Sequence, residues 1–283
     1  MPSDALALKY EKLRAILRSM ESVAIGYSGG VDSTLLLKVA FDTLGARAVA
    51  MIGRSETYPT REFEEAVAIA GAIGVRAVIV RTEETDDLKF RENPADRCYF
   101  CKTELFGKLG GIAAQEGLRW IADGTITDDI GDFRPGMKAK SEKEVRSPLL
   151  EAGLGKAEVR ELSRHLGLPT WDKPSFACLS SRFPYGTAIT RENLSRVDRA
   201  ETFFRDRGFR AFRVRFHDAS TARIEGSPSE FPRLLEDALR AELVGAMKEI
   251  GFIYVTLDLQ GYRSGSMNEV LSDETRSRYS SGA

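Results

Sequence analysis

A short stretch near the N-terminus combines a buried strand, a glycine turn and the start of a helix. Residues 23–27 are apolar and predict a strand, which the turn Ser28-Gly29-Gly30 ends. A helix is predicted to open at Asp32-Ser33-Thr34. The free N–H groups and the positive dipole end of such a helix bind phosphate. Glycine lets the backbone approach the anion closely. The stretch therefore predicts a phosphate-binding loop within an α/β fold.

The side chains of this loop suit a nucleotide with its metal ion. Ser28, Ser33 and Thr34 carry hydroxyl groups, and Asp32 carries a carboxylate that can hold Mg²⁺ beside phosphates. The spacing matches neither a Walker A loop nor the dinucleotide Gly-x-Gly-x-x-Gly turn. The alternative is a glycine turn that merely joins a strand to a helix. Such a turn does not require two glycines flanked by hydroxyls and a carboxylate.

The loop has a known counterpart. The run Ser28-Gly29-Gly30-Val31-Asp32-Ser33 resembles the signature of the PP-loop ATP pyrophosphatases. The resemblance implies binding of ATP and cleavage between its α- and β-phosphates, with all six residues in contact with the nucleotide or its metal ion.

The rest of the chain predicts two domains. Strands at 46–53, 75–81 and 118–123 alternate with helices, which favours a parallel sheet covered on both faces. From residue 190 the pattern changes to helices at 190–207 and 231–250 with strands at 209–217 and 252–259. We therefore predict a PP-loop α/β domain at 1–187 and a smaller α+β domain at 188–283. The polar tail from about residue 272 is expected to be frayed.

Composition limits the classes of protein to consider. The chain has 283 residues, of which 42% are hydrophobic and 29% charged, and this fits a globular protein with a core. A net charge of −1 gives no long-range attraction to a nucleic acid. No apolar run approaches the roughly 20 residues of a membrane span, and no secretory signal is evident. We expect a cytoplasmic protein with neither a membrane nor a nucleic-acid partner.

Two further loops follow predicted strands, where ligands of such sheets bind. Arg54 ends the second strand and is a candidate for the nucleoside part of ATP, although an ordinary loop is an equal alternative. The fourth strand ends in Asp123-Gly124-Thr125, followed by Asp128-Asp129. These residues suit contacts to magnesium and ribose, whereas their alternative is a solvated acidic turn.

The pair Cys98-x-x-Cys101 is ambiguous by itself. It suits a redox dithiol, half of a zinc site or part of an iron–sulfur site. A structural zinc site needs four ligands, and the chain has only two histidines, His165 and His217. His165 falls within a predicted helix and suits the surface or packing better than a metal. Zinc is therefore weakly supported.

A third cysteine, Cys178, lies in an aperiodic loop with Lys173, Ser181 and Arg182 nearby. Ordered loops of this kind are usually functional. Three thiolates can hold three irons of a [4Fe–4S] cluster and leave the fourth iron open, and basic neighbours favour thiolates. The alternative is a small buried hydrophobic residue.

A predicted strand of the second domain carries Arg213 and Arg215 on one face, while Phe212, Val214 and Phe216 point to the other. Two adjacent guanidinium groups suit a phosphate or carboxylate clamp. The alternative is a solvated strand face.

The motifs occur in an order that resembles the LarE family of ATP-dependent sulfur transferases, which help to build the nickel-pincer cofactor of lactate racemase. Besides the loop, the matching runs are Asp123-Gly124-Thr125 with Asp128-Asp129, Arg134-Pro135-Gly136, Lys173-Pro174-Ser175-Phe176-Ala177-Cys178, Ser181-Arg182-Phe183, Arg213-Val214-Arg215, Leu257-Asp258-Leu259 and Gly261-Tyr262-Arg263-Ser264-Gly265. Ile126-Thr127 departs from the Asn-Ala expected in the acidic loop, which puts a role of that asparagine in doubt.

The resemblance implies that ATP adenylates a carboxylate of a pyridinium-3,5-dicarboxylate mononucleotide, which a sulfur nucleophile then converts to a thiocarboxylate. It implies that Arg213 and Arg215 hold the substrate's phosphate, and that the enzyme is a homo-oligomer. Single-cysteine members donate the sulfur of the residue that matches Cys178. The additional Cys98 and Cys101 are similar to those of members with a [4Fe–4S] cluster, which implies repeated turnover.

Three other activities remain open. Some PP-loop tRNA thiolases also use three cysteines and a cluster, but the near-neutral charge argues against tRNA. Amidating ligases of the GMP or NAD synthetase kind share the loop and leave the cysteines without a role. A non-catalytic nucleotide-binding regulator is the third.

Overall fold

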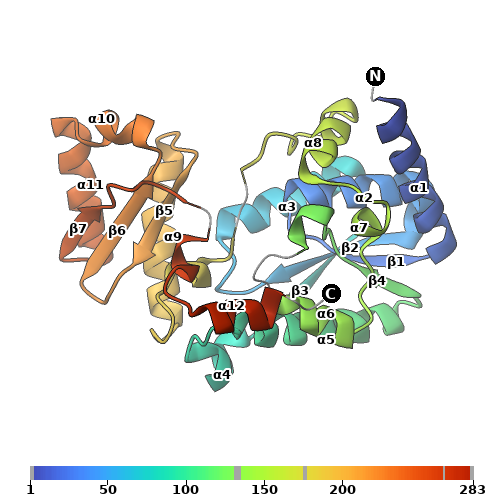
Figure 1. The fold of residues 1–283 in the computed structure, drawn as a ribbon, viewed down its shortest axis with the longest axis horizontal. Helices are drawn as coiled ribbons and strands as arrows, with labels where there is room; N and C mark the ends of the chain where they lie inside the picture. The colour runs from blue at the N-terminus through green and yellow to red at the C-terminus, as the bar shows by residue number, and fades with distance from the viewer. Residues whose placement is uncertain (1–2, 131–134, 175–176, 264, 281–283) are drawn as a thin grey trace. The chain divides into compact units, whose positions relative to one another are not determined.

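The structure, a computed structural model, describes residues 3–130, 135–174, 177–263 and 265–280. Four residues of the resembling motifs, Arg134, Ser175, Phe176 and Ser264, lie outside this part of the chain. The chain folds into two compact units (Figure 1). The first contains residues 1–84, 96–176 and 273–283, and the second contains 85–95 and 177–272. The loop that carries Cys178 thus groups with the second unit.

The first unit is built on a parallel sheet in the order β3-β2-β1-β4. Its strands are β1 (Val23–Gly26), β2 (Ala48–Arg54), β3 (Ala77–Arg81) and β4 (Trp120–Ala122). Val23 pairs with Ala48 on one side and with Trp120 on the other, so β1 is a central strand. The predicted α/β fold with a parallel sheet is confirmed.

Helices cover both faces of this sheet (Figure 1). The first face carries α1 (Asp4–Met20), α2 (Val31–Leu44), α3 (Thr60–Ile73), α7 (Pro148–Glu151) and α8 (Lys156–His165). The other carries α5 (Arg97–Gln115) and α6 (Gly136–Glu142). The first unit also includes α12 (Asp273–Ser280).

Alternation along the strands divides the core into two layers. Val23 and Ile25 of β1 pack into the layer with α1 and α2, whereas Ala24 between them packs against Phe106 and Leu109 of α5. This is the period of two that a strand buried on both faces requires. The continuous apolar run at 23–27 is explained by burial of every side chain in it.

The second unit has a three-stranded sheet in the order β5-β6-β7. Strand β6 (Thr221–Gly226) pairs antiparallel with β5 (Phe212–Phe216) and parallel with β7 (Tyr254–Leu257). Its helices are α4 (Leu88–Arg91), α9 (Arg191–Asp206), α10 (Phe231–Leu234) and α11 (Asp237–Ile250). Phe204 of α9 stacks on Phe212 of β5, with ring centroids 5.0 Å apart.

Two local expectations differ from the structure. The single helix expected at 231–250 is divided into α10 and α11, because Glu236 has extended dihedrals (φ −57°, ψ 133°). The tail expected to be frayed forms α12 instead, and Asp273 and Glu274 in its first turn favour the positive helix end. Within the part that the structure describes, no helix is long and apolar enough to cross a membrane.

Candidate active site

The loop between β1 and α2 has the backbone geometry of an anion site. Gly29 adopts φ +63°, and a Cβ there would lie 2.9 Å from the Cβ of Ala66 in α3. Only glycine fits this conformation and this close approach. Gly30 precedes α2 at the N-cap position and has no side chain that could cap this helix end. The amides here are therefore available to a ligand.

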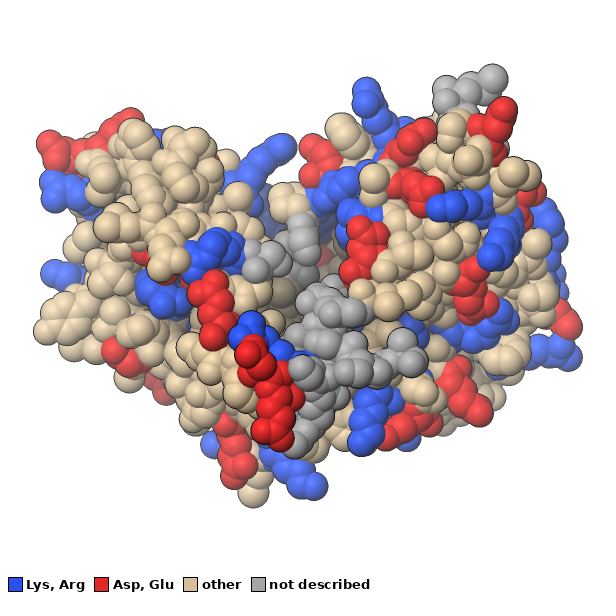
Figure 2. Space-filling view, viewed as in Figure 1, with Lys and Arg blue, Asp and Glu red and all other residues tan. Residues whose placement is uncertain are grey.

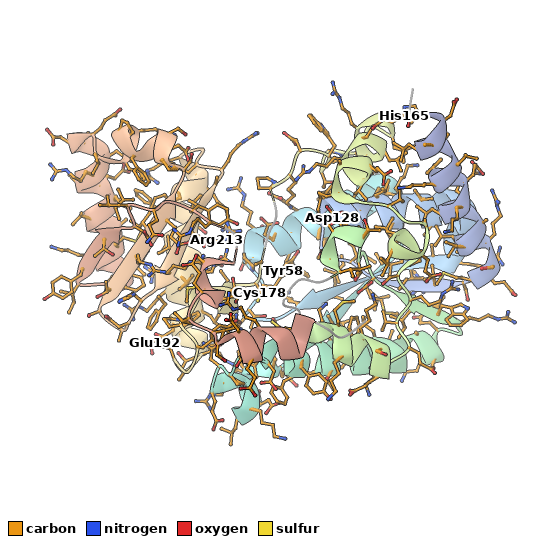
Figure 3. The ribbon with its side chains drawn as sticks, in the orientation of Figure 1. Tyr58, Asp128, His165, Cys178, Glu192 and Arg213 are labelled. Carbon is orange, nitrogen blue, oxygen red and sulfur yellow. The ribbon has the colours of Figure 1, made fainter. Side chains whose placement is uncertain are left out.

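The hydroxyl groups of Ser28 and Ser33 form hydrogen bonds within the loop. Ser28 and Ser33 have their Oγ atoms 3.2 Å apart, and Ser33 Oγ donates to the carbonyl of Gly30 at 3.3 Å. Tyr58, which follows β2, donates its phenol to the carbonyl of Ser28 at 2.6 Å (Figure 3). Burial raises the pKa of Tyr58, so the phenol stays protonated and keeps this donor role. Tyr58 thus holds the backbone of the phosphate loop in place through this hydrogen bond.

Asp32, the predicted magnesium ligand, has an ammonium group as its partner. Lys156 Nζ at the start of α8 lies 2.8 and 2.6 Å from the two carboxylate oxygens of Asp32. Burial raises the pKa of Asp32 above its ordinary value, although Lys156 opposes this shift. Asp128, predicted to contact the nucleotide, accepts the backbone N–H of Lys156 at 2.8 Å. The structure thus brings both predicted carboxylates to the same helix end.

The loop after β4 meets the phosphate loop directly. A Cβ on Gly124 would lie 2.9 Å from the backbone nitrogen of Ser33, so glycine permits this contact. Thr125 donates its hydroxyl to Asp123 at 2.8 Å. Asp123 also accepts from Ser147 at 2.5 Å and lies 3.2 Å from Lys140 Nζ. Burial would raise the pKa of Asp123, but Lys140, Lys102 and the hydrogen bonds from Ser147 and Thr125 together outweigh it and lower that pKa. Asp123 is therefore committed to protein donors.

Helix α3 holds two of the predicted nucleotide-binding cations. The guanidinium of Arg54 lies 5.1 Å from the ring centre of Phe63. Lys173 Nζ lies 2.7 Å from Glu62 and 3.0 Å from Glu65. The same ammonium lies 3.4 Å from the carbonyl of Gly29. Lys173 is thus at the phosphate loop, with its charge balanced by two carboxylates.

Cys98 and Cys101 lie near the start of α5, three residues apart, so they share one helix face. Neither cysteine forms a disulfide, and both are partly exposed. The buried carboxylate of Glu84 lies 3.9 Å from Cys101 Sγ and also accepts from Thr57 at 2.6 Å. Among the described residues, no three Cys, His, Asp or Glu side chains are gathered as a metal site. Cys98 and Cys101 belong to the first unit and Cys178 to the second.

In the second unit, Arg182 organises the loop of Cys178. Its Nη1 atom donates to the carbonyls of Ala177 at 2.8 Å and Cys178 at 3.0 Å, and to Ser181 Oγ at 2.7 Å. Its other nitrogens donate to Glu201 at 2.8 and 3.0 Å. Arg182 and Glu201 side chains are both 0% exposed. Arg182 therefore positions Cys178 through the backbone.

Arg213 and Arg215 share a strand face as predicted, but this face is more buried than a half-buried strand implies. Arg215 is buried and donates to Glu225 at 2.6 Å and to the carbonyl of Ser181 at 2.9 Å. Arg213 lies over the ring of Tyr262 at 4.8 Å. Burial and the neighbouring Arg182 lower the pKa of Arg213. An anionic ligand would relieve this concentration of positive charge.

The surface carries both signs of charge. Figure 2 shows basic and acidic side chains interspersed over the visible face of each unit. His165, which the sequence assigned to the surface or to packing, is exposed at the end of α8 (Figure 3).

Sequence reasoning missed Lys156, Glu201 and Tyr58. Glu201 had a detectable signal, because it falls on the apolar stripe of α9 between Val197 and Phe204, where a charge must be paired. Lys156 also had a sequence signal, because a lysine at the positive end of a helix is unfavourable unless an anion lies nearby. Tyr58 had no sequence signal.

Two of the known proteins to which the chain is similar match nearly all of it. No protein-family model matches it. A pyridinium-3,5-bisthiocarboxylic acid mononucleotide synthase of Lactiplantibacillus plantarum is 40% identical over 94% of this chain and 96% of its own length. An uncharacterized protein of Synechocystis is 46% identical over 94% and 99% of the two chains. A glutamine-hydrolyzing GMP synthase of Pyrobaculum aerophilum is 28% identical over 59% of this chain and 36% of its own.

Proposed function

The chain belongs to the family of pyridinium-3,5-bisthiocarboxylic acid mononucleotide synthases, and we propose that it is an ATP-dependent sulfur transferase of nickel-pincer cofactor synthesis. Its substrate is a pyridinium-3,5-dicarboxylate mononucleotide, one carboxylate of which becomes a thiocarboxylate. The observation that carries this proposal is 40% identity across nearly the full length of both chains, with the phosphate-loop geometry intact.

In the first stage, a substrate carboxylate oxygen attacks the α-phosphorus of ATP. The bond from that phosphorus to the bridging oxygen breaks, and pyrophosphate leaves with the electron pair. Gly29, Gly30 and the first turn of α2 offer backbone N–H groups to the phosphates. Lys173 places an ammonium group beside this loop, where Glu62 and Glu65 balance its charge in the absence of a nucleotide. Arg54, at the end of β2, is our candidate for a contact to the nucleoside part of ATP. The carboxylate of Asp32 has the hard oxygen donors that Mg²⁺ prefers, and the ion would neutralise phosphate charge when bound.

In the second stage, a sulfur nucleophile attacks the adenylated carbonyl carbon, and AMP leaves with the electrons of the broken C–O bond. We propose that Cys98, Cys101 and Cys178 would supply the three thiolates of a [4Fe–4S] cluster with one open iron, as the family resemblance implies. Such a cluster would supply exchangeable sulfide. The chain's own part is to hold Cys178 in place, through Arg182 and Ser181.

The second unit supplies the groups for the substrate's phosphate. Arg213 and Arg215 present guanidinium groups on one strand face, and bidentate donors of this kind suit phosphate. We propose small-molecule partners and, because the net charge is −1, no nucleic acid. We also propose that the enzyme acts in the cytoplasm, where ATP is present and thiols stay reduced, and that it forms a homo-oligomer, as the family resemblance implies.

The decisive experiment measures iron, acid-labile sulfide and thiocarboxylate product in protein purified without oxygen. We expect about four irons per chain and several products per chain when sulfide is supplied. Cys178→Ala and Cys98→Ala should lose the iron and the repeated turnover. Both should still release pyrophosphate from ATP, which requires the first unit's loop.

Two results would change the proposal. Absence of iron, with one product per chain and loss of sulfur from Cys178, would make Cys178 a sacrificial donor. Pyrophosphate release with tRNA, and none with the pyridinium mononucleotide, would refute the proposed substrate.

A further inference from the structure

We propose that Lys156 is a ligand of the β- and γ-phosphates of ATP and that Asp32 holds its ammonium group until Mg²⁺ arrives. This inference rests on the proposed function and assigns a residue to its first stage. The observation behind it is the two-oxygen contact of Lys156 Nζ with Asp32, at 2.8 and 2.6 Å.

The position of Lys156 in its own helix needs an explanation. It is the first residue of α8, where the helix dipole is positive and a lysine is unfavourable. Two of the orphan N–H groups of this helix end already have carboxylate acceptors. Asp128 accepts the N–H of Lys156 at 2.8 Å, and Glu158 accepts that of Gly155 at 2.9 Å. The ammonium is therefore a separate feature, and it is the group that α8 directs at the phosphate loop.

Asp32 places this ammonium beside the anion site. Asp32 lies in the first turn of α2, two residues after Gly30 of the phosphate loop. Its side chain is 24% exposed and that of Lys156 is 36% exposed. A carboxylate so far withdrawn from water is costly without a cation, and the pair is still open enough to exchange partners.

Arrival of Mg·ATP would exchange these partners. Mg²⁺ takes carboxylate oxygens, and those of Asp32 are the atoms that Lys156 contacts. The released ammonium lies on a flexible four-carbon stem, within reach of phosphate oxygens next to the same loop. Each charge has a partner before and after the exchange. The loop thus avoids both an unpaired carboxylate and an unpaired ammonium.

The test compares Lys156→Met with Lys9→Met. Lys9 forms an ion pair with Glu158 of the same helix at 2.7 Å, and its exposure is similar at 37%. Calorimetry with Mg²⁺ should show that Lys156→Met weakens ATP and pyrophosphate binding by roughly 10- to 100-fold. AMP lacks the β- and γ-phosphates, so its affinity should stay within about twofold. Lys9→Met should bind all three ligands as the wild type does.

A second measurement, made without nucleotide, should show that the same variant binds a metal ion more tightly. Titration with Mn²⁺, followed by electron paramagnetic resonance, should show tighter metal binding in Lys156→Met, because the carboxylate of Asp32 no longer has an internal cation. A lysine that merely anchors α8 would not produce weaker ATP binding together with tighter Mn²⁺ binding.

The outcomes separate this inference from the proposed function. Wild-type protein that binds no Mg·ATP would refute both. Wild-type binding with unchanged ATP affinity in Lys156→Met, or with equal losses for ATP and AMP, would refute only the role of Lys156. Unchanged Mn²⁺ affinity in Lys156→Met would refute the exchange at Asp32.

Discussion

Replacing Glu201 by leucine would test how the loop of Cys178 is held. Four protein donors converge on this carboxylate. They are Nε and Nη2 of Arg182 at 2.8 and 3.0 Å, Nη2 of Arg205 at 2.8 Å and the backbone N–H of Val214 at 3.3 Å. Burial would raise the pKa of Glu201, but Arg182 and Arg205 outweigh it and lower that pKa. Glu201 is therefore charged in the folded protein.

The size of the effect follows from burial. Both side chains of the Arg182–Glu201 pair are 0% exposed, so Glu201→Leu leaves a guanidinium without its buried counter-charge. Removing one partner of such a pair costs about 3–5 kcal/mol. The control is Glu242→Leu, which breaks an ion pair with Arg207 where Glu242 is 54% exposed. Exposed pairs contribute about 0–1 kcal/mol.

Hydrogen exchange measured by mass spectrometry can follow each unit separately. Peptides from α9 and β5 should exchange roughly 100- to 4,000-fold faster in Glu201→Leu. Peptides from α1 and α2 in the other unit should change little. The double variant Arg182→Met/Glu201→Leu should recover most of the protection, since it leaves no buried charge in this pair. Protection in Glu201→Leu equal to that in Glu242→Leu would refute the reasoning.

Two predictions concern the first unit. Gly29→Ala should lower the free energy of unfolding by at least about 1 kcal/mol more than Gly45→Ala does, and it should abolish ATP binding. Both glycines have a positive φ, but only a Cβ at Gly29 would clash with a neighbour, Ala66. Thermal unfolding and ATP titration measure this, and equal losses in both variants would contradict it. Asp123→Asn should cost about 3 kcal/mol at pH 7, because Lys140 loses its buried partner. The pKa of Asp123 is lowered, so its contribution exists above the unfolded-state pKa of about 4 and is lost as the pH falls through the folded-state pKa. The urea midpoints of the wild type and Asp123→Asn should therefore differ at pH 7, and the difference should shrink as the pH falls below about 4. A difference that stays constant with pH would exclude this cause.

Features that depend on neighbouring residues were predictable. The alternation of strands and helices predicted the parallel sheet, which the structure confirms as four strands. The paired glycines predicted a backbone that only glycine adopts, and Gly29 has φ +63°. Each property follows from local dihedrals and periodicity.

Features that depend on distant residues were not predictable. The strand pattern placed Arg215 on a half-buried face, whereas Glu225 on the neighbouring strand allows it to be buried. The candidate magnesium ligand Asp32 has as its partner a lysine 124 residues away. The tail at 273–280 reads as polar and frayed, yet it forms α12.

The sequence by itself determined the parallel α/β fold, the position of the phosphate loop and the identity of most candidate site residues. These follow from the intrinsic preferences of short contiguous segments, which act before the chain is compact. Only the tertiary structure decided which cation faces which carboxylate, and hence that Lys156 holds Asp32 and that Arg182 is committed to Glu201. The physical reason is that pairing of charges depends on burial and on distances between remote segments, and neither exists until the chain has folded.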